Sequence, residues 1–276
     1  MSGSSTASSS RPAAEATAAQ AGRRARITAV TSGKGGVGKT FLSANLAAAL
    51  AARGERVLVL DADLGLANLD IVLNLQPRFT LHDVFAGRCA LDEAILAAPG
   101  GFSVLLSGSG LVEYSRLTLD VRDQFERAVA TLAPRYDRVL LDTGAGISDV
   151  VLYSVSLAEE IVVLATPEPS SMTDAYATIK VLATQQARRA IRLVVNQVSQ
   201  AGEGSAICRQ LQLVIDRFVA PRLEVLAEPL KLELLGEIPI DPDVREAVFR
   251  RCLLLDSTPG CAAARAVGVI AGRLAG

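Results

Sequence analysis

Residues 27–40 read ITAVTSGKGGVGKT, and this stretch decides the fold. Gly33 is followed by four residues and then by Gly38, Lys39 and Thr40, which is the spacing of a P-loop. An apolar run typical of a β-strand precedes the loop, and a segment with helical spacing of apolar residues follows it. A glycine-rich turn would explain the glycines, but not the lysine and threonine in this order. The stretch therefore predicts a strand, loop and helix that bind nucleotide phosphates.

The residue types of this loop match the demands of a polyphosphate. Backbone N–H groups must wrap the phosphates without obstruction, and glycine leaves the backbone accessible. Lys39 is expected to neutralise the β- and γ-phosphates, and Thr40 to offer its hydroxyl to Mg²⁺ at the positive end of the helix. The predicted nucleotide-binding residues of this segment are Gly33, Gly35, Gly36, Val37, Gly38, Lys39, Thr40 and Phe41.

Outward from the loop, short apolar runs alternate with longer segments of helical spacing. The runs predict strands at 27–31, 57–60, 104–106, 138–142, 161–165, 193–195 and 234–238. Helices are predicted near 40–53, 117–133, 148–158, 171–187, 205–219, 242–251 and 259–274. The strands are too apolar to be half exposed, so we expect an α/β fold: one domain with a parallel-rich sheet covered by helices on both faces, as in P-loop NTPases. No repeat at a fixed period indicates a solenoid.

The N-terminal segment and the longest apolar runs indicate where the protein is located. Residues 1–25 are rich in Ser, Ala and Gly and lack the apolar core of a signal peptide, so they predict a disordered tail before an ATPase domain at 26–276. The longest apolar runs have the length of a strand rather than of a membrane span. We therefore expect a cytoplasmic protein, with at most transient contact at the inner membrane or cell pole.

Charge and cysteine content exclude several classes of site. The net charge of −1 and the pI of about 6.0 give no overall field that attracts nucleic acid or anionic lipid. The four cysteines have none of the close pairs of a zinc or iron–sulfur site, and the single histidine, His82, is expected at a helix start or on the surface. A transition-metal site built by the protein is therefore not expected.

A second lysine in the loop indicates a particular class of P-loop protein. With Lys34 early in the loop, the form GKGGVGKT resembles the deviant P-loop of the MinD/ParA family. This resemblance implies an ATP-dependent homodimer in which Lys34 reaches the ATP of the partner subunit. A solvated loop lysine would fit the spacing equally well, but it would not explain the further matches.

Two more segments resemble that family. DADLGLANLD, residues 61–70, is similar to its switch I segment, which implies that Asp63 positions or activates the attacking water and that Asp61 assists through Mg²⁺ or its waters. LLDTGAGISD, residues 140–149, is similar to its switch II segment and implies that Asp142 is oriented toward Mg²⁺. Carboxylates after parallel strands lie where open α/β sheets bind ligands. A purely structural role stays open for either Asp61 or Asp63.

Later loops resemble the part of the family that recognises the base. VVNQV, residues 194–198, implies that Asn196 hydrogen-bonds adenine, although asparagine at a strand end is also a common turn former. GEIPIDPDV, residues 236–244, is similar to the loop that closes over the base, which implies roles for Pro239 and Asp241.

Two segments favour one branch of the family. Gly144 stands where the commonest MinD form has proline, and DTGAGISD and TPEPSSMTDAYATIK, residues 142–149 and 166–180, resemble the flagellar-number regulators of the FlhG/FleN type. That branch implies an ATPase switch whose partner is a flagellar transcription activator of the FleQ/FlrA type or a basal-body protein. The alternatives are a ParA- or MinD-type partition or division-site ATPase and, less favoured, a metabolic ATP-dependent ligase.

Three partners are not expected. The tail lacks the glutamine-containing motif DQAxxLR with which flagellar regulators stimulate an FlhF-type GTPase. DNA binding is unlikely, because the basic residues form only modest pairs at 188–189 and 250–251. The end of the chain resembles the last core helix of the family, and its two arginines, Arg265 and Arg273, without any aromatic residue predict weak or absent membrane attachment.

Overall fold

The computed structural model describes residues 25–65, 68–108, 117–223 and 228–276. The tail predicted at 1–25 therefore lies outside the described residues except for Ala25, as do positions 66 and 67 of the switch I segment. The strands are β1 (Arg26–Ser32), β2 (Val57–Ala62), β3 (Ile95–Ala97), β4 (Ser103–Leu105), β5 (Arg138–Ala145), β6 (Glu160–Ala165), β7 (Ala190–Val198) and β8 (Lys231–Pro239). The α-helices are α2 (Lys39–Ala51), α3 (Leu69–Leu73), α4 (Leu81–Phe85), α5 (Leu119–Leu132), α6 (Asp149–Ser156), α7 (Pro169–Gln185), α8 (Glu203–Phe218), α9 (Pro242–Phe249), α10 (Leu254–Ser257) and α11 (Ala262–Ala275).

All eight strands form one sheet in the order β3-β4-β2-β5-β1-β6-β7-β8. The seven predicted strands pair in parallel, and β3, which the sequence did not predict, pairs antiparallel with β4 at the edge. β3 was missed because it is short and only partly buried, so its residues lack the continuous apolar run of the inner strands. The predicted α/β fold with a parallel-rich sheet is confirmed.

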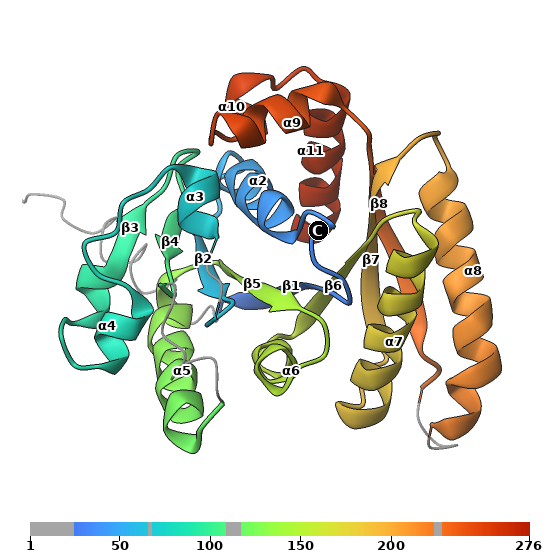
Figure 1. Ribbon diagram of the computed structural model, residues 1–276, viewed down its shortest axis with the longest axis horizontal. Coiled ribbons are helices and arrows are strands. Elements are labelled where there is room, and N and C mark those ends of the chain that lie inside the picture. Colours follow the sequence, from blue (N-terminus) through green and yellow to red (C-terminus); the bar gives the residue numbers. More distant parts are fainter. Residues whose placement is uncertain (1–24, 66–67, 109–116, 224–227) are drawn as a thin grey trace, which may run out of the picture.

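Helices cover both faces of the sheet (Figure 1). α2, α9, α10 and α11 lie on one face, and α5, α6, α7 and α8 lie on the other. Successive strand residues alternate between the two cores: Leu58 and Leu60 pack with the second group of helices, whereas Val57 and Val59 pack with the first. This alternation follows from the period of two in a strand, and it explains why the strands read as continuously apolar.

The helix after the P-loop is buried on nearly every side. α2 packs against both the sheet and its neighbour α11, and Leu42, Ala44 and Leu46 have no solvent exposure. Small alanines allow the close approach of α11, and a helix that is apolar all round is the expected sequence for such a central position. The P-loop therefore joins two buried elements, β1 and α2, which fix both of its ends.

The structure tests the expected locations of the last helix and of the single histidine. α11 packs in the core as expected: Val267, Ile270 and Leu274 are buried, and the buried guanidinium of Arg138 donates to the Leu274 carbonyl oxygen at 2.9 Å. His82 does lie at a helix start, in α4, but a surface location was wrong, because it is 1 % exposed and burial lowers its pKa to about 4. No helix among the described residues has the length and apolarity needed to cross a membrane.

Candidate functional site

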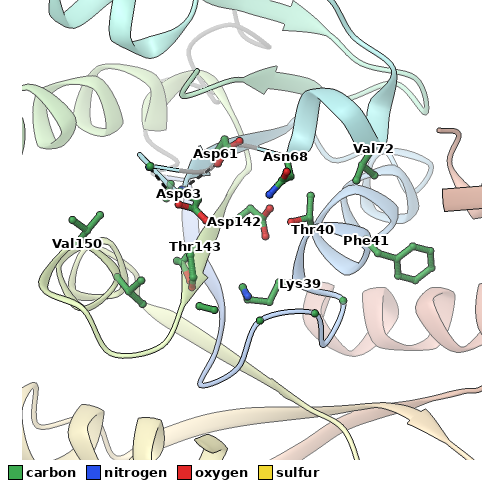
Figure 2. Close-up of a pocket in the computed structure, with 18 of the residues that line it drawn as sticks. Lys39, Thr40, Phe41, Asp61, Asp63, Asn68, Val72, Asp142, Thr143 and Val150 are labelled. Carbon is green, nitrogen blue, oxygen red and sulfur yellow. Dashed lines mark hydrogen bonds between the residues drawn. The ribbon is translucent and has the colours of Figure 1, made fainter. Parts of the chain in front are cut away.

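A cavity of about 890 Å³ opens at the carboxyl ends of the central strands, between the P-loop, α3 and the segment that leads into α6 (Figure 2). This volume lies within the range of small-molecule sites. The site also lies where the strand order changes direction around β1, the usual ligand position in an open α/β sheet. Its lining includes the predicted residues Gly35, Gly36, Gly38, Lys39, Thr40, Phe41, Asp61, Asp63 and Asp142.

The P-loop glycines serve different purposes. Gly36 and Gly38 have positive φ angles of 78° and 99°, which suit glycine and turn the chain into α2. Gly33 instead lies against α7: a Cβ atom there would be 2.2 Å from the carbonyl oxygen of Asp174. Val37 is buried in the core that contains α2. The cradle therefore depends partly on packing against neighbouring elements as well as on access for phosphate.

Lys39 lies at the floor of the cavity and is 9 % exposed. Its ammonium group donates to Ser32 Oγ at 3.0 Å, and Ser32 Oγ in turn donates to the Lys34 carbonyl oxygen at 2.7 Å. Burial lowers the pKa of Lys39, whereas the charges of Asp142 and Asp63 act in the opposite direction. A polyanion in the cavity would meet a desolvated ammonium group that is already oriented.

Three carboxylates face this lysine from the ends of β2 and β5 (Figure 2). Asp61 and Asp142 occupy paired positions on these adjacent strands, and both are buried. Burial, followed by the charge of Asp142, raises the pKa of Asp61 well above its ordinary value. Burial also raises the pKa of Asp142 to about 6, despite hydrogen bonds from Thr40 and Ser43.

These oxygens fit a divalent cation. Asp61 Oδ2 is buried and has no hydrogen-bond partner among the described residues, and the Asp142 carboxylate lies nearby. The Thr40 hydroxyl completes a set of oxygen donors, the type that Mg²⁺ prefers. A cation would offset the repulsion that adds to burial in raising both carboxyl pKa values. The residues predicted as metal ligands are thus brought together.

Of the three residues predicted for base recognition, Asn196 contacts the P-loop, and none of the three lines the cavity. Asn196 Nδ2 donates to the Val37 carbonyl oxygen at 2.8 Å, and its Oδ1 accepts from the Gln197 N–H. Asp241 caps α9 and also accepts from the Ala263 N–H, and this bond lowers the pKa of Asp241. Pro239 ends β8, just before Asp241. The predicted contacts of Asn196, Pro239 and Asp241 with adenine stay predictions.

Lys34 lies apart from the other lysine. Its Nζ contacts Glu168 Oε2 at 2.7 Å and Ser170 Oγ at 2.9 Å, at the start of α7. Both charged side chains are more than a third exposed, so this pair contributes at most ~1 kcal/mol. The geometry separates the two lysines by location: Lys39 faces the chain's own cavity, and Lys34 faces α7.

Residues 28–254 match the family described as the CobQ/CobB/MinD/ParA nucleotide binding domain. The chain belongs to this family. Antiactivator FleN of Pseudomonas aeruginosa is 38% identical over 246 residues, which cover 89% of this chain and 85% of that protein. Flagellum site-determining protein YlxH of Helicobacter pylori is 33% identical over 251 residues, 90% of this chain and 81% of that protein.

A solved structure of the family is also similar. The septum site-determining protein MinD of Pyrococcus horikoshii, solved in complex with Mg-ADP, has a TM-score of 0.73 and 27% identity, covering 91% of this chain and 96% of that one. As a member of the MinD/ParA family, the chain is an ATPase, and the resemblance inferred from its P-loop and switch segments is confirmed.

Several residues of this MinD/ParA-type site were not found from the sequence. Ser43 donates to Asp142 Oδ1 at 2.9 Å, and it follows Thr40 by three residues, so helical spacing could have placed both hydroxyls on one face of α2. Ser32, whose hydroxyl accepts a hydrogen bond from the Lys39 ammonium, precedes the first loop glycine. Asn68, Val72 and Val248 line the cavity, but no local pattern distinguishes them.

The contact between Gly33 and α7 gives a test on the unliganded ATPase. Gly33→Ala is expected to lower the free energy of unfolding by about 2 kcal/mol or more, because the added methyl group would overlap the α7 backbone, which cannot rotate away. Gly35→Ala is the matched control, since a Cβ at Gly35 meets nothing within 4 Å. Urea denaturation without nucleotide measures both variants. Equal stability of the two would contradict this packing role.

Proposed function

We propose that this ATPase is a dimerising switch that regulates flagellar number, hydrolysing ATP to ADP and phosphate. The observation that carries the proposal is the cavity between the P-loop and three strand-end carboxylates, in a chain 38% identical to an antiactivator named FleN. The similarity to a flagellum site-determining protein points in the same direction. Residues 26–276 act as one ATPase domain in this proposal, and the switch works in the cytoplasm.

The proposed chemistry uses groups that already face the cavity. Lys39 and the loop N–H groups bind the phosphates, and Thr40 and Asp142, assisted by Asp61, would hold Mg²⁺. The bound ion would supply charge neutralisation at the phosphate oxygens. Asp63 lies across the cavity from the loop and orients the attacking water.

Dimerisation is the step assigned to Lys34. Its ammonium lies on α7 rather than in its own cavity, so it is available to a second copy once it leaves Glu168 and Ser170. This exchange costs little, because the pair is exposed. In the proposed cycle the ATP-bound homodimer binds a flagellar transcription activator of the FleQ/FlrA type or a basal-body protein, and hydrolysis releases it.

Removal of the Asp63 carboxylate separates binding from hydrolysis. Asp63→Ala is expected to bind Mg²⁺ and ATP and to dimerise, but to hydrolyse ATP at least about 100-fold more slowly, because the phosphate-binding residues are unchanged. The dimer should therefore accumulate. Single-turnover hydrolysis and light scattering measure the two properties. Hydrolysis at the wild-type rate would exclude Asp63 from this role.

The biological part of the proposal requires counts of flagella. Deletion of the gene is expected to produce extra flagella and raised flagellar transcription if the switch restrains an activator, and Lys39→Ala should not restore normal counts. Electron microscopy of deletion and complemented strains makes the measurement. Unchanged flagellar counts together with a defect in segregation or septum placement would instead support a partition or division-site ATPase.

A further inference from the structure

The main chain of Asp63 is fixed by bonds from both sides. Its N–H donates to Asp61 Oδ1 at 3.1 Å, which ties it to the end of β2. Its carbonyl oxygen accepts from the hydroxyl of Ser107 at 3.0 Å. Ser107 has no solvent exposure and follows β4, so this bond ties the switch I segment to a neighbouring strand. A residue that must orient one water molecule gains from such restraint, since small displacements at a reacting centre are costly.

The Asp63 side chain is confined by Gly144. A Cβ atom at Gly144 would lie 3.3 Å from both Cγ and Oδ2 of Asp63, and 3.3 Å from Cγ2 of Val151. Val151 is buried in α6 and cannot move aside readily, so an added methyl group would displace the Asp63 carboxylate. On its other side, Asp63 Oδ1 accepts from the Gly65 N–H at 3.4 Å. Because Gly144 has no side chain, the Asp63 carboxylate can lie this close to the switch II segment.

We propose that Ser107 and Gly144 are positioning residues for ATP hydrolysis: Ser107 holds the Asp63 main chain, and Gly144 sets how closely the Asp63 carboxylate approaches the switch II segment. The inference rests on the proposed role of Asp63. Neither residue needs to contact the nucleotide phosphates for this purpose. Gly144 lines the cavity beside Asp63, but the Lys39–Ser32 hydrogen bond and the lining residues of the P-loop involve neither Gly144 nor Ser107. Substitutions at these two positions are therefore expected to act on the rate of hydrolysis rather than on phosphate binding.

The test uses the full chain with Mg²⁺ and ATP. Ser107→Ala and Gly144→Ala are each expected to lower kcat about tenfold, while affinity for a fluorescent ATP analogue changes by less than about twofold. Ser154→Ala is the matched control: its buried hydroxyl also donates to a main-chain carbonyl oxygen, that of Val150, but within α6. This control is expected to retain the wild-type kcat.

A second arm asks whether the effect passes through Asp63. In an Asp63→Ala background, Ser107→Ala and Gly144→Ala are expected to cause no further loss in single-turnover rate, because the side chain that they position is gone. The proposal is overturned if either single variant keeps a kcat within about twofold of the wild type, or if its loss persists in full in that background. If Asp63→Ala itself hydrolyses at the wild-type rate, the proposed role of Asp63 fails first. The two failures are thus distinguishable.

Discussion

Lys39→Ala is expected to abolish ATP binding, whereas Lys34→Ala should leave binding to the monomer largely intact. Lys39 is buried at the floor of the cavity, and its ammonium is oriented by Ser32. Removing the ammonium from a buried pair of ammonium and bound phosphate costs about 3 kcal/mol or more, which weakens binding at least ~100-fold. Lys34 contacts Glu168 and Ser170 instead, outside the cavity lining.

Lys34→Ala is therefore the matched control for the first variant, and it also tests the homodimer. The variant is expected to bind a fluorescent ATP analogue as the wild type does, but to remain monomeric with ATP and to hydrolyse it poorly. Fluorescence titration and light scattering with ATP make the two measurements. An ATP-dependent dimer of Lys34→Ala would contradict the contact between subunits, and tight ATP binding by Lys39→Ala would contradict the assignment of the cavity.

Asp142→Asn is expected to stabilise the unliganded protein while lowering Mg²⁺-dependent hydrolysis by at least about 100-fold. Burial raises the pKa of Asp142 from its ordinary 3.8 to about 6, so the folded protein holds an unfavourable charge at neutral pH. A shift of this size corresponds to at most ~3 kcal/mol. Asparagine keeps an oxygen for the Ser43 hydroxyl, but it carries no charge for a cation.

The pH dependence gives the sign of this effect. Because the folded-state pKa of Asp142 is raised, the neutral carboxyl contributes to the stability of the fold. This contribution is fully present below pH 3.8 and is lost as the pH rises through about 6. The stability gain of Asp142→Asn should therefore be largest at neutral pH and should disappear at the acid end of this window. Mg²⁺-dependent ATP binding by the wild type should weaken as the pH falls through the same window, since the protonated carboxyl does not bind a cation.

Denaturant unfolding across that pH range measures the first effect. Asp123→Asn on the exposed side of α5 is the control, and it should change the free energy of unfolding by no more than about 0.5 kcal/mol. An Asp142→Asn protein that is less stable than the wild type at neutral pH would show that the Asp142 carboxylate supports the unliganded fold rather than being tolerated for its chemistry.

The sequence alone determined the class of fold and most of the site. The P-loop is contiguous, so its chemistry can be predicted from residues 33–40 without knowing what surrounds them. Asp61, Asp63 and Asp142 were predicted to lie together because each follows an apolar run, and the carboxyl ends of parallel strands meet at one edge of the sheet. A period of two and a period of 3.6 are local properties, and the seven parallel strands follow from them.

Only the tertiary structure decided which neighbours support those residues. The bond from Ser43 to Asp142 joins positions 99 residues apart, and the bond from Ser107 to Asp63 joins positions 44 residues apart. Gly33 had an apparent reason in the P-loop pattern, yet its close contact is with the backbone of α7. His82 lies at a helix start, one of its two expected locations, but its burial was not predicted from the sequence. Contacts of this kind depend on which side chains of separate elements meet, and these individual pairings leave no periodic or local pattern in the chain.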